Sequence, residues 1–243
     1  MKTTSTAICR DDDKVQYSKS SHSQTGLPRL VEGVIAAIAL VVFSPCLLFA
    51  SLLIATSSPG PILFRQKRMG RNGRLFTLFK FRTMRVNDAG PLVTAAGDDR
   101  VMPIGRILRR TKLDELPEFW NVLIGDMSLV GARPEVPHFV DLDNVQWRQV
   151  LQSRPGLTDP VTIRLRNEEQ LLATVSEPER FYLEVLQPYK LMGYVDYLNN
   201  RTWWKDLKVI LKTAIAVVVS SKAPPPTTEE ILSYRAEILE SDA

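Results

Sequence analysis

A long uncharged stretch near the N-terminus is the feature that most constrains this chain. No charged residue occurs over residues 33–64, and the most apolar part covers residues 34–55. At a rise of ~1.5 Å per residue, a helix of that length just matches the ~30 Å hydrocarbon core of a bilayer. The first expectation is therefore one transmembrane helix. A signal peptide fits poorly, because the stretch begins late and is too long.

Ser44-Pro45 lies at the centre of this stretch. Proline removes one backbone donor and clashes with the preceding turn, so we expect the helix to kink there. The Ser44 hydroxyl can donate to a carbonyl that the proline leaves free, which lowers the cost of the break in lipid. Each arm, 34–43 and 46–55, would be about 15 Å long, about half of the core. A helix that enters the membrane, bends and leaves on the same side is therefore feasible.

Both flanks of the stretch are basic. The flanking lysines and arginines are Lys14, Lys19 and Arg29 before it, and Arg65, Lys67, Arg68, Arg71 and Arg74 after it. Because lysine and arginine are favoured in cytoplasmic loops, a re-entrant hairpin with both ends in the cytoplasm satisfies this rule and a span does not. The residues alone leave the kinked single span and the re-entrant hairpin both open.

By composition, the chain divides into four segments. We expect a disordered tail over 1–28, a membrane helix over 29–57, one folded domain over 58–222, and a proline-rich segment with a last helix over 223–243. Within the domain, Asn72-Gly73 between the runs 62–68 and 75–82 predicts a β-hairpin. The rest of the domain has mostly helical patterns, so the predicted fold class is α+β, mainly helical.

Two helices of the domain carry specific expectations. One should begin near Ser176 and end before Pro188, because proline does not continue a helix. The other, over 203–219, is amphipathic, with lysines on one face and apolar residues on the other. A basic amphipathic helix that starts with tryptophans suits a membrane interface. A helix packed on the core would show the same pattern, and both interpretations stay open.

The composition limits the chemistry. The formal net charge is +4, which suits phosphate-rich partners such as nucleic acid, anionic lipid or a nucleotide-sugar, without distinguishing them. Only two cysteines (Cys9 and Cys46) and two histidines (His22 and His138) occur. A disulfide, a histidine-based zinc site and a Ser-His-Asp triad are therefore not expected. Any chemistry must rest on carboxylates.

The predicted hairpin is strongly basic, with eight lysines and arginines over residues 65–85. Most of them suit contact with anionic lipid headgroups. Lys80 and Arg82 are the candidates for holding substrate phosphates.

Two adjacent carboxylates are the main candidates for chemistry. Asp114 and Glu115 lie between two arginines, Arg109 before them and Arg133 after them. Taken alone, an aspartate at such a place is more often the N-cap of the next helix, here over 115–123 with Gly125 as a helix stop. The residues alone favour that structural interpretation.

A series of longer motifs changes this balance. In chain order they are Ser44-Pro45, Lys80-Phe81-Arg82-Thr83-Met84, Leu108-Arg109, Leu113-Asp114-Glu115-Leu116-Pro117, Asn121-Val122-Leu123, Gly125-Asp126-Met127-Ser128, Gly131-x-Arg133-Pro134, Arg154-Pro155-Gly156-Leu157-Thr158 and Tyr197…Trp203-Trp204-x-Asp206-Leu207. In order and spacing, the chain resembles the bacterial sugar transferases, the polyprenyl-phosphate hexose-1-phosphate transferases. The resemblance covers about residues 30–219.

The resemblance implies a re-entrant membrane helix hairpin, kinked at Ser44 and Pro45, that carries a small cytoplasmic catalytic domain with a β-hairpin and interfacial amphipathic helices. Residues 58–222 would be the catalytic domain. It also implies an enzyme, a monotopic phosphoglycosyl transferase, at the cytoplasmic face of the bacterial inner membrane.

The reaction implied is transfer of a hexose-1-phosphate from a UDP-sugar to undecaprenyl phosphate, with release of UMP and a phosphosugar-aspartyl intermediate. By motif position, Asp114 would be the nucleophile and the ligand of Mg2+, with Glu115 as a catalytic partner of open role. Substrate phosphate would be held by Arg109, Arg133, Lys80 and Arg82. The nucleotide-sugar pocket would include Arg154, Pro155, Gly156 and Thr158.

Two departures from the family pattern are visible. Ala132 stands where the family usually has proline, which could loosen the loop carrying Arg133. Thr158-Asp159 differs from members that continue with glycine, a variation between subfamilies.

Two alternatives remain. One is a membrane glycosyltransferase that releases UDP, for which Asp141-x-Asp143 would be a weak D-x-D element. The other is a non-enzymatic membrane adaptor. No nucleic-acid partner is expected. The sugar, the glycan pathway and the oligomeric state, including a homodimer, are left open.

Overall fold

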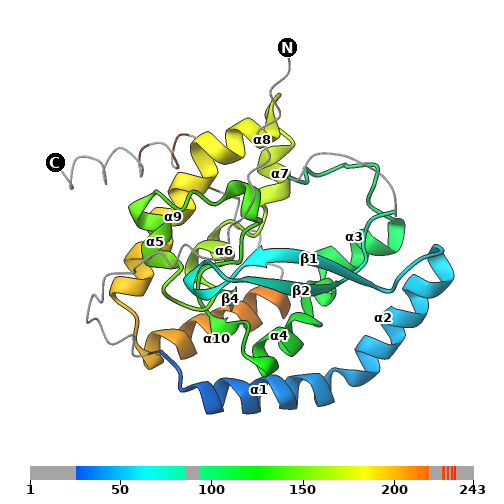
Figure 1. Ribbon diagram of the computed structural model, residues 1–243. Coiled ribbons are helices and arrows are strands. Elements are labelled where there is room, and N and C mark those ends of the chain that lie inside the picture. The colour runs from blue at the N-terminus through cyan, green and yellow to red at the C-terminus, as the bar shows by residue number, and fades with distance from the viewer. Residues whose placement is uncertain are drawn as a thin grey trace.

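The computed structural model describes residues 26–85 and 93–218, and a few single positions between 226 and 233. The tail predicted over 1–28 and the segment 223–243 therefore lie almost entirely outside the described residues. Helices dominate this part of the chain, and its strands form two sheets of two strands each (Figure 1). The prediction of a mainly helical fold with a small β part is confirmed.

The apolar stretch forms two helices, α1 (Arg29–Val42) and α2 (Ser44–Ser57), bent by 59° at their junction. Ser44 Oγ donates a hydrogen bond to Val41 O at 2.7 Å. Pro45 lies in the first turn of α2, where its missing N–H removes no helical bond. The predicted kink and the serine bond are both confirmed. Among the described residues, no single helix has the length and apolar composition to cross a membrane, whereas this bent pair together does.

The β-hairpin is formed as predicted, with bounds shifted by a residue at most of its ends. β1 (Leu63–Met69) pairs antiparallel with β2 (Leu75–Phe81), from Leu63 opposite Phe81 to Met69 opposite Leu75. The turn contains the short helix η1 (Arg71–Gly73), in which Asn72 has a φ of 56°. Asparagine adopts this left-handed conformation more easily than most residues.

One buried amide joins the centre of the molecule to the hairpin. Three short elements follow the hairpin along the chain: α3 (Pro103–Arg110), η2 (Leu113–Glu115) and α4 (Glu118–Ile124). The side chain of Asn121, fully buried in α4, donates to Thr77 O at 2.7 Å and accepts from Phe79 N at 3.1 Å. Both partners are backbone atoms of β2, so this amide fixes α4 against the strand.

A second, parallel sheet lies beside α4. β3 (Ser128–Val130) pairs with β4 (Gly156–Thr158). The two backbone segments approach so closely just beyond β3 that a Cβ on Gly156 would lie 2.1 Å from Gly131 N. Glycine is therefore required at this contact.

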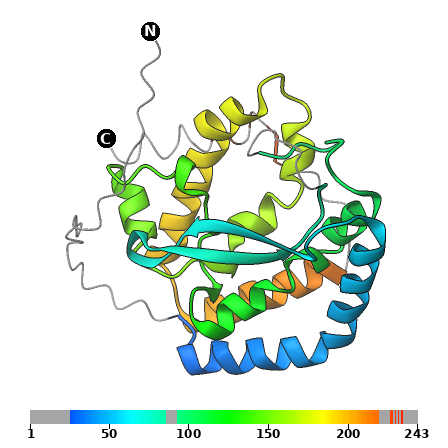
Figure 2. The same cartoon turned by 45° about the vertical axis from the view of Figure 1, so that its right-hand side comes forward.

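Six further helices complete the domain: η3 (Pro137–Phe139), α5 (Val145–Val150), α6 (Pro160–Arg164), α7 (Glu168–Leu172), α8 (Pro178–Phe181) and α9 (Gln187–Asn199). They cover the side of the hairpin away from α1 (Figures 1 and 2). Their apolar side chains, together with those of residues 182–186, form most of the largest core cluster, which contains Trp147, Leu172 and Leu186.

The prediction that a helix ends before Pro188 is wrong. α8 continues into a π-helical turn, η4 (Tyr182–Leu186), and then directly into α9. Gln187 N donates to Tyr182 O, five residues back, and Pro188 lies in the first turn of α9. The wider π turn changes the hydrogen-bond register just before the proline, so the missing N–H falls where a new helical segment begins.

A buried charged cluster holds the beginning of α1 against α10 (Trp203–Val218). Asp206, which is fully buried, accepts from Arg201 Nη2 at 2.8 Å, from Leu27 N at 2.9 Å and from Tyr197 Oη at 2.5 Å. Figure 2 shows the start of α1 beneath the start of α10 at this place. The membrane-type helix pair is thus fixed to the domain at its first turn.

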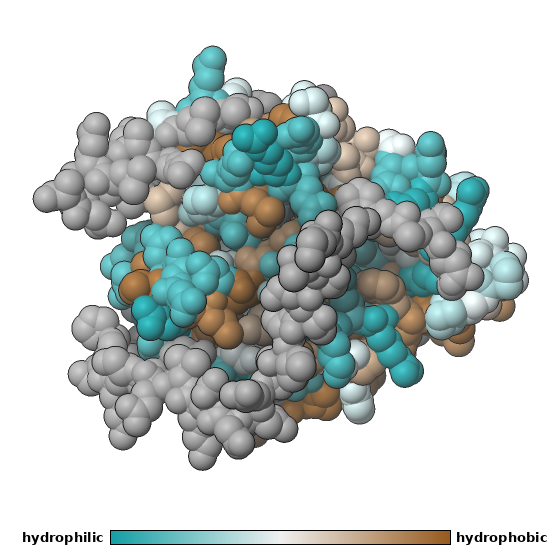
Figure 3. Space-filling view, turned by 45° about the horizontal axis from the view of Figure 1, so that its top comes forward, coloured by the Kyte–Doolittle hydropathy of each residue, from teal (hydrophilic) through white to brown (hydrophobic). Residues whose placement is uncertain are grey.

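Large apolar side chains are exposed on the outer helices. On α1 and α2 they include Ile38, Leu48 and Leu52. α10 exposes Leu207 and Leu211 as well as its lysines, so packing on the core does not account for its whole apolar face. Figure 3, in which the top of the molecule is turned toward the viewer, shows hydrophilic and hydrophobic residues interspersed on the visible face.

We expect Asp206→Asn to destabilise the fold by about 3–5 kcal/mol, because it removes the charge of the fully buried acid that pairs with the Arg201 guanidinium at 2.8 Å. Thermal unfolding followed by circular dichroism of the purified protein measures this. Glu177→Gln is the control, since it removes an acid from an exposed pair with Arg180, and should leave the melting temperature nearly unchanged. Equal melting temperatures for Asp206→Asn and the wild type would contradict the structural role of the cluster.

Candidate active site

The turn between α3 and α4 carries the two adjacent carboxylates. Lys112 enters the left-handed region with a φ of 57°, and the following turn η2 contains Asp114 and Glu115. Strained residues of this kind cost about 1–3 kcal/mol and are concentrated at functional sites. The N-cap interpretation of Asp114 is wrong, because α4 begins only at Glu118 and has no side-chain cap. Gly125 does end α4, in the left-handed conformation, as predicted.

Glu115 gathers three positive side chains. Its Oε1 atom lies 2.6 Å from Arg133 Nη2, 3.3 Å from Lys80 Nζ and 3.7 Å from Lys112 Nζ. Burial alone would raise the pKa of Glu115, but the charges of Arg133, Lys80 and Lys112 hold that pKa well below its usual range. Glu115 is therefore an anionic centre that brings cations together from the hairpin, from the residue before η2 and from the loop after β3.

Asp114 is different, although it is the next residue. It is buried, and its Oδ1 atom has no hydrogen-bond partner among the described residues. Burial, and then the negative charge of Glu115, raise the pKa of Asp114, while Lys80, Lys112 and Arg109 oppose the rise. Buried carboxylate oxygens are normally paired, so this one is available to a ligand, to a metal ion or to an electrophile.

A third carboxylate, which the sequence analysis did not assign to the site, belongs to the same cluster. Glu118 Oε1 lies 3.0 Å from Lys80 Nζ, and the Glu118 side chain is only 1% exposed. A signal was present in the sequence, since positions four apart, such as Asp114 and Glu118, share a helix face. That spacing is too common to have identified the residue.

Arg109, a predicted phosphate-binding residue, is near the pair but occupied. Its Nε donates to Thr83 Oγ1 at 2.9 Å, and its Nη1 lies 3.0 Å from Glu169 Oε1 on α7. Its charge opposes the rise in the pKa of Asp114, which burial and Glu115 cause. A substrate phosphate would have to compete with Glu169 for this guanidinium.

Arg133 lies beside the acidic pair, although Ala132 stands where the family usually has proline. Ala132 is buried, and its carbonyl accepts from Gly156 N at 2.8 Å. Glu135 further fixes the loop by accepting from Tyr182 Oη and by pairing with Arg68 at 3.4 Å. These contacts hold the loop that carries Arg133, and the loosening expected from the missing proline stays a prediction.

Arg82 has a different place from the one predicted for it. Its guanidinium donates to Ser58 O at 2.6 Å and to Pro59 O at 2.7 Å, and the residue is buried. These contacts hold the end of α2 against the end of the hairpin. Both terminal nitrogens thus have partners in the fold, and the expectation that Arg82 binds phosphate stays a prediction.

The predicted nucleotide-sugar residues build the second sheet. Gly156 and Thr158 are in β4, and the Thr158 hydroxyl is 2.7 Å from Thr213 Oγ1 of α10. Pro155 is buried and its carbonyl accepts from Ser128 N. Among the described residues, no hydrogen bond or ion pair joins Arg154 to Asp114 or Glu115.

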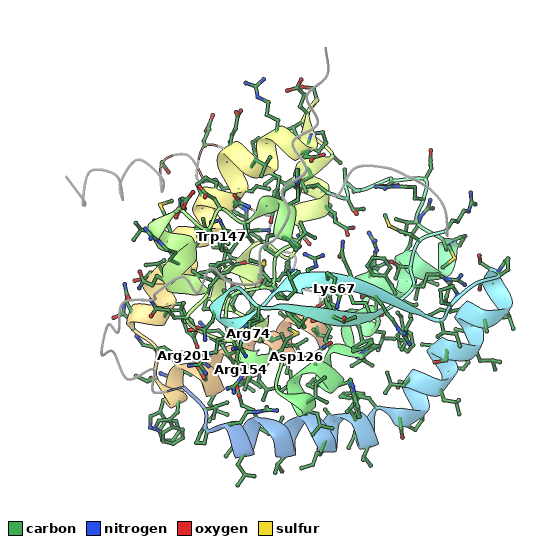
Figure 4. All side chains as sticks on the ribbon, in the orientation of Figure 1. Lys67, Arg74, Asp126, Trp147, Arg154 and Arg201 are labelled. Carbon is green, nitrogen blue, oxygen red and sulfur yellow. The ribbon has the colours of Figure 1, made fainter. Side chains whose placement is uncertain are left out.

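Pro155, Gly156 and Thr158 thus have structural contacts in this geometry. The segment before β4 packs on the hairpin turn, where Asn72 N donates to Leu151 O, and Figure 4 shows Arg154 below the hairpin, near Arg74. They support the loop of Arg133 from beneath, and the expectation that they line the nucleotide-sugar pocket stays a prediction.

A metal ion has one candidate ligand here. Among the described residues, no group of three or more histidines, cysteines and acids could hold a metal ion by itself. Mg2+, however, is commonly bound by one or two carboxylates together with substrate phosphates and water. The unpartnered Oδ1 atom of Asp114 fits that pattern.

The sequence profile of the bacterial sugar transferases matches residues 23–220. The chain belongs to the bacterial sugar transferase family. This confirms the resemblance seen in the motifs, and with it the prediction of a transferase enzyme.

Three relatives illustrate the similarity. A UDP-glucose:undecaprenyl-phosphate glucose-1-phosphate transferase from Caulobacter vibrioides is 38% identical over 201 residues, which cover 80% of this chain and 71% of that protein. A protein of the same name from Escherichia coli is 36% identical over 81% of this chain and 41% of its own length. A UDP-N-acetylgalactosamine-undecaprenyl-phosphate N-acetylgalactosaminephosphotransferase from Aeromonas hydrophila is 33% identical over 73% of this chain and 40% of its own length. The chain thus spans less than half of the last two relatives.

We expect Arg82→Gln to destabilise the protein by about 1–3 kcal/mol, because it removes the buried guanidinium that donates hydrogen bonds to the carbonyls of Ser58 and Pro59. Thermal unfolding checks this, with the exposed hairpin residue Arg74, changed to Gln, as the matched control. If both variants melted like the wild type, the carbonyl contacts would not be stabilising, and Arg82 would again be free for a substrate.

Proposed function

We propose that this chain transfers a hexose-1-phosphate from a UDP-sugar to undecaprenyl phosphate and releases UMP, the first membrane step of bacterial polysaccharide or glycoconjugate synthesis. The names of the relatives support the two substrates. The structural observation that carries the proposal is the contrast within the acidic pair. Glu115 is surrounded by cations, while the buried Oδ1 of Asp114 has no partner.

In the first step, an oxygen of the Asp114 carboxylate attacks the phosphorus that bears the sugar. A bond forms between that oxygen and phosphorus, and the bond from phosphorus to the bridging oxygen of the diphosphate breaks. UMP leaves with the electron pair, and a phosphosugar-aspartyl intermediate remains. A carboxylate nucleophile of this kind divides one transfer into two easier steps.

In the second step, an oxygen of the lipid phosphate attacks the same phosphorus. The bond to the Asp114 oxygen breaks, which restores the carboxylate, and polyprenyl diphosphate-sugar is the product. No proton has to be moved in either step. An unpaired carboxylate without a general base therefore suffices for this chemistry.

In both steps an anion must approach another anion: the Asp114 carboxylate approaches the diphosphate, and then the lipid phosphate approaches the intermediate. The cations around Glu115 would reduce this electrostatic repulsion. Arg133, Lys80 and Lys112 all reach Glu115 Oε1 within 3.7 Å. Positive groups held in advance of the reaction stabilise the charge that spreads over the transferring phosphoryl oxygens. In this proposal Glu115 is a catalytic partner that organises these cations next to the nucleophile.

Mg2+ is the proposed cofactor, with Asp114 as its protein ligand. When bound, it would neutralise part of the charge of the diphosphate. Glu115 is less available as a second ligand, because one of its oxygens already contacts three cations.

The proposed location is the cytoplasmic face of the bacterial inner membrane. The bent helices α1 and α2 with their exposed apolar side chains, and the exposed tryptophans and leucines of α10, support contact with membrane lipids. The lipid phosphate lies at headgroup level and UDP-sugars are dissolved in the cytoplasm, so a re-entrant α1–α2 pair would suit both substrates. The proposal does not include a homodimer.

Product analysis tests the reaction. Purified protein in detergent, given undecaprenyl phosphate, Mg2+ and a panel of UDP-sugars, is expected to release UMP with one or a few sugars. Asp114→Asn should lower the rate by at least about a thousandfold, since the nucleophile is removed. Release of UDP would indicate ordinary glycosyl transfer instead. Release of neither nucleotide across the panel would leave the non-enzymatic adaptor.

The same assay tests the metal. Chelation by EDTA should abolish UMP release, and added Mg2+ should restore it. Full activity in EDTA would remove Mg2+ from the proposal without affecting the role of Asp114.

Topology tests the membrane placement. With a protease-sensitive tag at either terminus, we expect digestion in inverted inner-membrane vesicles and protection in intact spheroplasts, because both ends of a re-entrant pair face the cytoplasm. A kinked single span predicts that one of the two tags is digested in spheroplasts. That result would overturn the re-entrant arrangement.

A further inference from the structure

Lys80 is held between two carboxylates from different elements. Its Nζ atom lies 3.3 Å from Glu115 Oε1 in η2 and 3.0 Å from Glu118 Oε1 in α4. The lysine itself is on β2, with its side chain 18% exposed. One ammonium group thus joins the hairpin to both elements that follow the acidic pair.

Glu118 depends on this lysine. Its side chain is 1% exposed, and Lys80 is the cation with which it forms an ion pair in the described part of the chain. The contact is an ion pair whose geometry falls short of a regular hydrogen bond. A buried carboxylate is costly unless it is paired, so the position of Lys80 near Glu118 is strongly favoured.

The backbone around Lys80 is fixed from the same helix. Asn121, one turn after Glu118, bonds to Thr77 O and Phe79 N of β2. α4 therefore fixes both the strand that carries Lys80 and the carboxylate that meets its ammonium group. The lysine side chain is long and flexible, and the strand contact alone would not determine where its charge lies.

We propose that Glu118 is a positioning residue that holds the Lys80 ammonium beside Glu115, where it meets the transferring phosphate. The inference rests on the function proposed above. With two anionic partners, Lys80 can turn one N–H toward a substrate phosphate and still be held by the other carboxylate. Without Glu118, the ammonium group would be fixed only by Glu115 and by water.

The expected kinetic effect follows from this role. Glu118→Gln should lower kcat by about tenfold or more, because small displacements of a catalytic group cost large factors in rate. KM for the UDP-sugar should change much less, since the positive charge of Lys80 remains in the site. Glu118→Asp, which keeps the charge on a shorter side chain, should recover part of the lost kcat.

A double-mutant cycle tests whether Glu118 acts through Lys80. Wild type, Glu118→Gln, Lys80→Gln and the double variant are compared by UMP release with a UDP-sugar that the wild type accepts. If Glu118 acts through Lys80, the double variant should have the kcat of Lys80→Gln, because coupled residues are not additive. If the double variant instead loses kcat by the product of the two single losses, Glu118 and Lys80 act independently, and the proposal is overturned.

Glu168 offers a matched control. It forms a partly buried glutamate–lysine pair, with Lys190 Nζ at 2.7 Å, and among the described residues no hydrogen bond or ion pair joins Glu168 to Asp114 or Glu115. In the double variant Glu168→Gln with Lys80→Gln, the effects of the two single substitutions on kcat should therefore multiply. Non-additivity in this control cycle as well would mean that the cycle reports general loss of stability, and would overturn the proposal.

A labelling experiment separates this inference from the proposed function. The folded protein is acetylated with acetic anhydride, and the extent of acetylation at Lys80 is measured by mass spectrometry, with Lys67 as the internal reference. The ratio of Lys80 to Lys67 acetylation should be several-fold higher in Glu118→Gln than in the wild type. Unchanged labelling overturns the positioning role even if UMP release is observed. Increased labelling without UMP release from any variant supports the positioning of Lys80 and overturns the phosphosugar transfer.

Discussion

The ion pair between Glu115 and Arg133, 2.6 Å long, is the interaction on which the site depends. Two neighbouring carboxylates in a buried turn repel each other, and without nearby cations at least one of them would be protonated. The pairing lowers the pKa of Glu115 and raises that of Arg133, so this pair stays charged. Asp114 can then remain unpartnered, with its pKa raised by burial and by Glu115. The acidic pair is thus divided into one residue that holds cations and one that is left free.

The cations reach Glu115 because three separate pieces of the fold converge there. Arg133 comes from the loop after β3, whose path depends on the close contact between Gly131 and Gly156. Lys80 comes from β2, which the side chain of Asn121 fixes to α4. A diphosphate that approaches Asp114 would find these charges already in place, so little reorganisation would be needed during the reaction.

Local chemistry predicted the parts of the fold that depend on neighbouring residues. The break at Pro45, the hairpin turn at Asn72 and the end of α4 at Gly125 are of this kind. The π turn before Pro188 was not predictable, because it depends on a change of helical register that no single residue specifies. Site roles were harder still. A basic residue such as Arg82 has the same sequence pattern whether it binds a phosphate or a backbone carbonyl. The residues alone favoured a structural role for Asp114, and only the family motifs favoured a catalytic one.

The attachment of α1 connects the membrane-type helices to the site itself. Glu32, in the first turn of α1, is buried and accepts from Leu129 N at 3.1 Å, while Arg201 donates to Val130 O at 2.9 Å. Both contacts are made to β3, and the chain passes from β3 through Gly131 directly to Arg133. A buried carboxylate this close to the start of the apolar stretch is stable only against protein donors. The first turn of α1, β3 and the Arg133 loop therefore form one connected unit. If α1 and α2 enter the bilayer, this unit, rather than a flexible linker, sets the depth at which a lipid phosphate meets Asp114.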